Sequence, residues 1–197
     1  VRTKIMGKLT TEKYEQSQRV ETELNYLITE KMPDYRDEME QMLFKLPMAG
    51  SAFKKIYFDP ILERPVSQFV PAEDLVVSYG ASNLRTAPRF THVMKKTPEE
   101  ILKLQVNGFY VDVELPAATK DITDIEEKYN ELEGSEPTFS DDPRHTVLEM
   151  HVDLDLPEPF GDMDGVALPY VVTIDKSSTT ILAIRRNWYE DDTKREK

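Results

Sequence analysis

The segment from Thr146 to Leu156 alternates apolar and polar side chains more strictly than any other part of the chain. Successive side chains of a β-strand point to opposite faces, so alternation of this kind predicts a strand. One face would carry Leu148, Met150, Val152, Leu154 and Leu156, and the other Glu149, His151, Asp153 and Asp155. The segment is therefore predicted to be a half-buried strand of an antiparallel sheet.

Shorter segments with the composition of strands lie on both sides of this one. They are predicted at residues 53–58, 66–70, 75–79, 90–94, 170–175 and 180–188. Asp59-Pro60 and the run Lys176-Ser-Ser178 are turn signals, so the first two strands and the last two are predicted to form hairpins.

The first fifty residues have helical spacing instead. Thr10 or Thr11 can cap a first helix, Pro33 ends it and can open a second, and Pro47 with Gly50 ends the second. The apolar stripes are Tyr14, Val20, Leu24, Leu27 and Ile28 in the first helix and Met39, Met42, Leu43 and Leu46 in the second. A methionine stripe at this spacing is typical of packing against a neighbour.

A third, short helix is predicted to start at the run Thr97-Pro-Glu-Glu100, which combines a cap, a proline at the first position and a capping box. Gly108 supplies the left-handed residue that ends it. The predicted fold class is α+β: an N-terminal helical hairpin at residues 1–49, then a mostly antiparallel β region with one or two embedded helices at residues 50–197.

The 197 residues are enough for one domain or two small ones, and they carry 37 acidic and 25 basic side chains, a net charge of −12. Residues 121–164 hold 15 acidic and two basic residues, so all the net negative charge lies in this segment. A surface helix at 121–132 and a polar loop at 134–143 are predicted there. The charge excludes a general affinity for polyanions such as nucleic acid.

Two further classes are excluded by composition. The chain has no cysteine, which rules out disulfides, cysteine-bound zinc, iron–sulfur clusters and thiol catalysis. No apolar run approaches the roughly 20 residues of a membrane helix, so no membrane partner is expected. The chain begins at Val1 and ends in a charged run at 190–197, and we interpret it as a fragment excised from a longer protein.

The best candidate for a metal site is the polar face of the long strand, with Glu149, His151, Asp153 and Asp155. Alternate residues would point three carboxylates and an imidazole the same way, although neighbours two apart are roughly 6–7 Å apart along a strand. Asp162 and Asp164 could contribute from the following loop. The simpler interpretation is the solvated face of a half-buried strand, which we favour.

The remaining motifs are weak. His92, His145 and His151 form no zinc-binding or catalytic pattern, and each is predicted to be a surface or edge residue. No nucleophile elbow, dinucleotide fingerprint or phosphate loop is present. Arg185-Arg186 beside Trp188, and Lys95-Lys96, could hold single-stranded nucleic acid, but a strand that ends in a packed tryptophan is the favoured interpretation.

Six runs carry a resemblance to a known family. They are AGSAFKKIYFDP (49–60), FVPAEDLVVSYGA (69–81), APRFTH (87–92), LQVNGFY (104–110), LPYVVTID (168–175) and RNW (186–188). In number and order they resemble the portal protein of short-tailed, double-stranded DNA bacteriophages. The resemblance covers residues 48–115 and 145–190, and it places this chain in the wing, the outward-projecting α+β region of each subunit.

The resemblance implies a structural role and no enzyme activity. The family forms a dodecameric ring at one capsid vertex of the virion, through which DNA is packaged and ejected. The implied partners are other portal subunits, capsid and scaffold proteins, terminase and tail factors, with assembly in the host bacterial cytoplasm and DNA met only in the channel of the full ring. It implies no catalytic, cofactor-binding or metal-binding residue.

An alternative function stays open from the sequence. A metal-dependent hydrolase or nuclease could use the acidic strand around His151. Another is a module whose methionine-rich helix at 32–46 binds a partner helix.

Overall fold

The computed structural model describes residues 2–59, 62–118, 128, 143–157 and 165–188. The chain forms two compact units, Val1–Glu73 and Asp74–Lys197. The predicted boundary between residues 49 and 50 is the point where the second helix ends and the first strand begins, whereas the compact units divide at residue 73.

The first unit begins with two helices. Helix α1 (Thr11–Tyr26) starts at Thr10, whose side chain accepts a hydrogen bond from the N–H of Lys13 at 3.4 Å, and it continues into a π-helical turn, η1 (Leu27–Lys31). Helix α2 (Tyr35–Ala49) ends at Gly50, which has a φ of 74°, a left-handed conformation that glycine adopts without strain. Both helices were predicted, with Thr10 and Gly50 among the expected end residues, but α2 starts after Asp34 and contains Pro47, which was expected to help end it.

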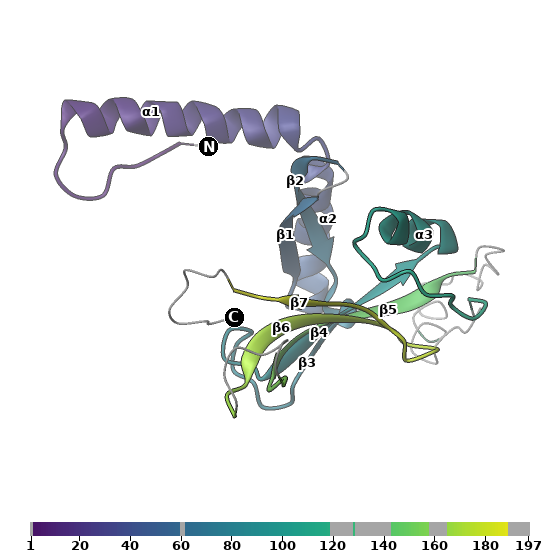
Figure 1. Ribbon diagram of the computed structural model, residues 1–197. Helices are drawn as coiled ribbons and strands as arrows, with labels where there is room; N and C mark the ends of the chain where they lie inside the picture. Colours follow the sequence, from purple (N-terminus) through teal and green to yellow (C-terminus); the bar gives the residue numbers. More distant parts are fainter. Residues whose placement is uncertain (1, 60–61, 119–127, 129–142, 158–164, 189–197) are drawn as a thin grey trace. The chain divides into compact units, whose positions relative to one another are not determined.

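An antiparallel hairpin follows, made of β1 (Phe53–Asp59) and β2 (Arg64–Val70) (Figure 1). Helix α2 packs against β2. The N–H of Phe69 donates to the Glu38 carboxylate, and the Lys54 ammonium lies 4.1 Å from the centre of the Tyr35 ring. These contacts explain why the hairpin belongs to the same compact unit as the helices.

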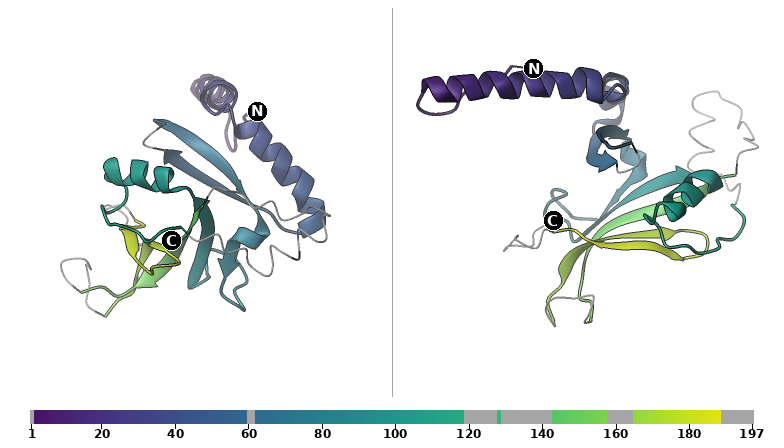
Figure 2. Two further views of the ribbon diagram at one scale, coloured as in Figure 1. Left: turned by 90° about the vertical axis from the view of Figure 1, so that its right-hand side faces the viewer. Right: turned by 45° about the horizontal axis from the view of Figure 1, so that its top comes forward.

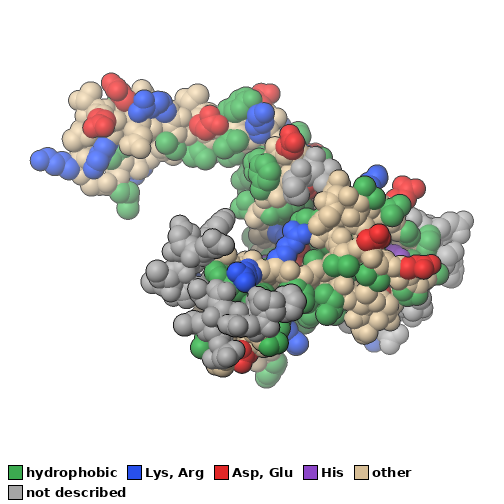
Figure 3. All heavy atoms as spheres, viewed as in Figure 1, with side chains coloured by type: hydrophobic (Ala, Val, Ile, Leu, Met, Phe, Trp, Pro, Cys, Tyr) green, Lys and Arg blue, Asp and Glu red, His purple; other side chains and the backbone are tan. Residues whose placement is uncertain are grey.

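The first unit buries few apolar side chains. In its described part, the buried apolar residues are Met32, Phe69 and Val70. No residue of α1 or α2 is buried, and exposed apolar side chains include Tyr14 and Val20 on α1 and Phe44 and Met48 on α2; Figure 3 shows hydrophobic side chains at the surface of α1. The predicted apolar stripes therefore do lie on helices. The other described residues of this unit leave both stripes partly exposed.

The second unit is a five-stranded antiparallel sheet in the order β3-β4-β5-β6-β7. Its strands are β3 (Leu75–Val77), β4 (Arg89–Lys96), β5 (His145–Leu154), β6 (Leu168–Asp175) and β7 (Ile181–Arg186). A short 3₁₀ turn, η2 (Ala72–Asp74), precedes β3. All five strands were predicted within a few residues. The fold class, α+β with a helical N-terminal region and antiparallel sheets, is confirmed.

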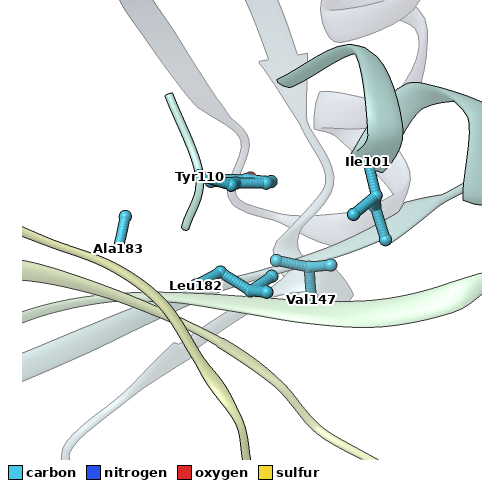
Figure 4. Close-up of a cluster of buried hydrophobic side chains, with 5 residues drawn as sticks. All are labelled: Ile101, Tyr110, Val147, Leu182 and Ala183. Carbon is cyan, nitrogen blue, oxygen red and sulfur yellow. The ribbon is translucent and has the colours of Figure 1, made fainter. Parts of the chain in front are cut away.

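Helix α3 (Pro98–Val106) covers one face of this sheet, as Figures 1 and 2 show. The predicted capping box is present: the Glu100 N–H donates to the Thr97 side chain, and the Thr97 N–H donates to the Glu100 carboxylate. Ile101 points from α3 toward the sheet, where Val147 and Leu182 lie, with Tyr110 and Ala183 completing the cluster (Figure 4).

A second cluster lies on the opposite face of the sheet. It is built on Leu168, Tyr170 and Val172 of β6, and the alternating apolar residues of β5 pack against it. This is the apolar face that the alternation in the sequence predicted for β5. The helix predicted at 121–132 and the loop predicted at 134–143 lie outside the described residues, apart from Lys128.

The first cluster gives a stability prediction. Leu182 is fully buried, whereas Leu102 on α3 is 58% exposed. Leu182→Ala removes buried methyl groups and leaves a cavity, so we expect a loss of about 2–5 kcal/mol in the free energy of unfolding. Leu102→Ala is the matched control and should change it by less than about 1 kcal/mol. Urea denaturation of both variants measures this, and equal losses would contradict the packing described here.

Candidate functional site

The polar face of β5 is the candidate site, and the neighbouring strands complete it. Pairing of β4 with β5, β5 with β6 and β6 with β7 aligns side chains in rows across the sheet. One row contains His92, Glu149 and Thr173, and the next contains Phe90, His151, Val171 and Arg185. These side chains lie on the same face of the sheet as Val147, and α3 packs over that face at Val147.

Glu149 and His151 contact each other at the centre of this face. The His151 Nε2 atom lies 3.6 Å from the Glu149 carboxylate, and the two side chains are 22% and 16% exposed. The Phe90 ring stacks on the His151 ring, with centroids 4.4 Å apart and an angle of 12° between the planes. The His151 imidazole thus stacks on an aromatic ring and has a carboxylate beside its Nε2 atom.

The other two members of the predicted metal set do not join this pair. Asp153 is exposed, and Asp155 follows the end of β5 and is also exposed. Asp162 and Asp164 lie outside the described residues. In the part of the chain that the structure describes, no group of three or more His, Cys, Asp or Glu side chains is placed to hold a metal ion.

The favoured interpretation of this face as solvated is only partly correct. Val147, two residues before Glu149 and on the same face, is fully buried beneath α3. The face therefore changes along β5 from covered at Val147, through half-buried at Glu149 and His151, to exposed at Asp153. The sequence could not show this, because the covering helix lies some forty residues earlier in the chain.

The prediction that the histidines are surface or edge residues was wrong for two of the three. His92 and His145 are 7% and 6% exposed. His92 lies on β4, an interior strand of the sheet, opposite Glu149. His145 starts β5, also an interior strand, and lies beside a buried carboxylate.

That carboxylate belongs to Asp175, which the sequence analysis did not single out. It is fully buried at the end of β6. One of its oxygens accepts hydrogen bonds from the Ser177 hydroxyl at 2.6 Å, the Ser178 N–H at 2.8 Å and the Ser178 hydroxyl at 2.7 Å. The other oxygen lies 3.4 Å from Nδ1 of His145. The sequence did contain a signal for this buried carboxylate: an aspartate at the start of a predicted hairpin turn, with serines two and three residues later.

This environment favours the ionised form of Asp175. Burial by itself raises the pKa of the carboxyl group, because it removes the charged form from water. The hydrogen bonds from Ser177 and Ser178, together with the nearby His145, act more strongly in the opposite direction. The pKa of Asp175 is therefore below its ordinary value.

The two arginines considered for nucleic-acid binding point to opposite faces of the sheet, because they are consecutive on β7. The Arg185 guanidinium lies 3.4 Å from the centre of the Phe109 ring and donates a hydrogen bond to the Phe109 carbonyl. Burial lowers the pKa of Arg185, while Tyr110 and Glu149 act against this lowering.

Arg186 lies on the other face, 5.8 Å from the centre of the Trp188 ring. Trp188 packs edge-on against Tyr170, with centroids 5.1 Å apart, as part of the second apolar cluster. The favoured interpretation of a strand closed by a packed tryptophan is confirmed. Lys95 and Lys96 are consecutive on β4, and their side chains likewise leave opposite faces.

Comparisons with protein-family models and with curated proteins yield no match to this chain. Among the described residues, no helix is both long and apolar enough to cross a membrane.

The buried carboxylate predicts a pH dependence of stability. Because folding lowers the pKa of Asp175, its contribution is complete above about pH 5 and is lost as the pH falls below about 4, through the folded-state pKa. Asp175→Asn should lower the free energy of unfolding at pH 7 and weaken its dependence on pH in that acidic range. Thermal unfolding between about pH 2 and pH 7 measures both effects. Asp153→Asn, at an exposed position of the same sheet, is the control, and an unchanged acid dependence in Asp175→Asn would contradict the assignment.

Proposed function

We propose that this chain is the wing region of the portal protein of a short-tailed, double-stranded DNA bacteriophage. In this role it acts as a structural and interaction domain and is not an enzyme. It belongs to a dodecameric ring at one capsid vertex, through which DNA enters and leaves the virion.

The observation that carries the proposal is the exposed apolar surface of the first unit. Leu43, Phe44 and Met48 on α2 are 56%, 74% and 82% exposed, and Ile56 and Phe58 on β1 are 70% and 63% exposed. A unit of this size that buries so little apolar surface gains little stability by itself. Exposed apolar surface on this scale is typical of a chain that completes its fold in an assembly.

The six runs that carry the resemblance give the proposal its family. In the structure they coincide with structural positions: the end of α2 and β1, the end of β2 through β3, the start of β4, the end of α3, and β6 with the residues after β7. Among them are Ala87, Tyr110 and Tyr170, which are almost completely buried. Their positions in strands, at helix ends and in the core support a structural role.

Charge also agrees with this role. The excess of acidic residues at 121–164 makes the chain repel polyanions, which suits a domain that lies close to packaged DNA without binding it. The proposed partners are other portal subunits, capsid and scaffold proteins, terminase and tail factors. The proposed location is the capsid vertex of the virion, after assembly in the bacterial cytoplasm.

Electron microscopy of the intact gene product tests the proposal. We expect rings with twelvefold symmetry, and antibodies raised against this chain should label the outer edge of each ring. The same antibodies should label a single vertex of purified virions opened to expose the capsid interior. Absence of any ring from the intact product, or labelling spread over the whole capsid, would overturn the proposal.

The alternative, a metal-dependent hydrolase or nuclease on the acidic face of β5, requires a separate test. Titration with Mn²⁺ or Mg²⁺, followed by a nuclease assay, should show neither saturable binding nor cleavage. The decisive variant is Asp153→Asn, with Asp112→Asn as a control at an exposed acidic position outside the strands. Saturable binding together with cleavage that is lost only in Asp153→Asn would establish the alternative.

A further inference from the structure

The outer edge of β1 has backbone groups available for pairing with another strand. β1 and β2 form a two-stranded sheet, so each has one outer edge. Glu38 accepts a hydrogen bond from the Phe69 N–H, which therefore points outward from β2.

The strand register extends this observation to β1. Phe69 pairs with Lys54, Ser67 with Ile56, and Pro65 with Phe58. In an antiparallel pair, residues opposite each other both direct their backbone groups either inward or outward. The backbone groups of Lys54, Ile56 and Phe58 thus point outward from β1.

The two edges of the hairpin differ in a way that matters for pairing. On β2, the Glu38 carboxylate occupies the Phe69 N–H, and Pro65 has no N–H to donate. On β1, the outward N–H and C=O groups of Ile56 and Phe58 have no hydrogen-bond partner among the described residues. The β2 edge is thus blocked at Phe69 and Pro65, whereas the β1 edge is available at Ile56 and Phe58, which favours joining two hairpins through their β1 strands.

Exposed apolar side chains lie beside the available edge. Ile56 and Phe58 share a face of the hairpin with Lys54 and Phe69, which contact α2. They nevertheless stay exposed because α2 packs over β2. At 100° per residue, Glu38 lies on the flank of α2 toward the outer edge of β2, and Leu43 lies on the opposite flank, toward β1. We call Leu43, Ile56 and Phe58 the edge patch.

We propose that β1 pairs in antiparallel fashion with β1 of a second copy of this chain, about a two-fold axis at Ile56. Lys54 then lies opposite Phe58 of the second copy, Ile56 opposite Ile56, and Lys55 opposite Tyr57. The outward groups of Lys54, Ile56 and Phe58 become hydrogen-bonded pairs, and the two hairpins form one four-stranded sheet. The two edge patches meet over the central strands, between the two α2 helices.

The sequence of β1 is complementary to itself in this arrangement. Lys54 and Lys55 precede Ile56, and Tyr57 and Phe58 follow it, so antiparallel pairing about Ile56 places each lysine opposite an aromatic residue of the second copy. Within one chain the Lys55 ammonium already lies 5.2 Å from the centre of the Tyr57 ring. Shifting the register one way places Lys55 opposite Lys55. Shifting it the other way places Lys54 opposite Pro60, which has no N–H to donate.

This pairing does not rest on the proposed function. A two-fold contact joins two chains and then closes, whereas a ring is built from head-to-tail contacts through other surfaces. The chain can therefore form the β1 pair whether or not the intact product forms rings, and the two results are measured separately.

A cysteine crosslink tests the pairing, since the chain has no cysteine of its own. Residues in a hydrogen-bonded antiparallel pair have Cα atoms about 5.5 Å apart, within the range of a disulfide. Ile56→Cys lies on the proposed two-fold axis and should form a disulfide-linked dimer under mild oxidation. Phe44→Cys, at a similarly exposed apolar position on the far side of α2, is the control. We expect crosslinking of Ile56→Cys to be faster by about a hundredfold, because pairing raises the effective thiol concentration. Equal rates would overturn the proposal.

Sedimentation of the unmodified chain gives a second, independent test. We expect a dimer that dissociates in Ile56→Pro, since this change removes an outward N–H that the hairpin itself does not use. Far-UV circular dichroism checks that the variant keeps its fold. A monomeric unmodified chain at high micromolar concentration would overturn the proposal, as would a dimer that persists in folded Ile56→Pro.

Discussion

Pairing of β5 with β4 on one edge and β6 on the other organises the second unit. Because β5 lies in the middle of the sheet, each of its side chains is committed to one of two faces. Its even-numbered residues pack with β6 and Trp188, and Val147 packs beneath α3. Both apolar clusters of the sheet therefore depend on the register of this one strand, and a shift by one residue would exchange the two faces.

One buried carboxylate of the sheet has polar partners in the turn that follows it. Asp175 accepts hydrogen bonds from Ser177 and Ser178 in the turn after β6, and it lies beside His145 at the start of β5. The three hydrogen bonds to one carboxylate oxygen offset part of the cost of burying Asp175, whereas its other oxygen and Nδ1 of His145 lie 3.4 Å apart without a hydrogen bond.

The first unit differs from the second in how little apolar surface it buries. Its helices and hairpin are specified locally, by caps, turns and the contact between α2 and β2. Few of its apolar side chains are buried, and the edge of β1 is available for pairing. A unit with these properties has apolar surface and strand edge that a partner could cover. The proposed wing and the proposed β1 pair both follow from this property, although they concern different contacts.

The sequence by itself determined the local elements of this protein. Alternation identified β5, the run Thr97-Pro-Glu-Glu100 identified the start of α3, and Thr10 and Gly50 marked helix ends, because each signal depends on neighbouring residues. The tertiary structure alone decided which of these surfaces are covered. It placed α3 over Val147, buried His92 and His145, separated Arg185 from Arg186 and left the edge of β1 available. Burial depends on residues that are distant in the chain, and no local pattern records them.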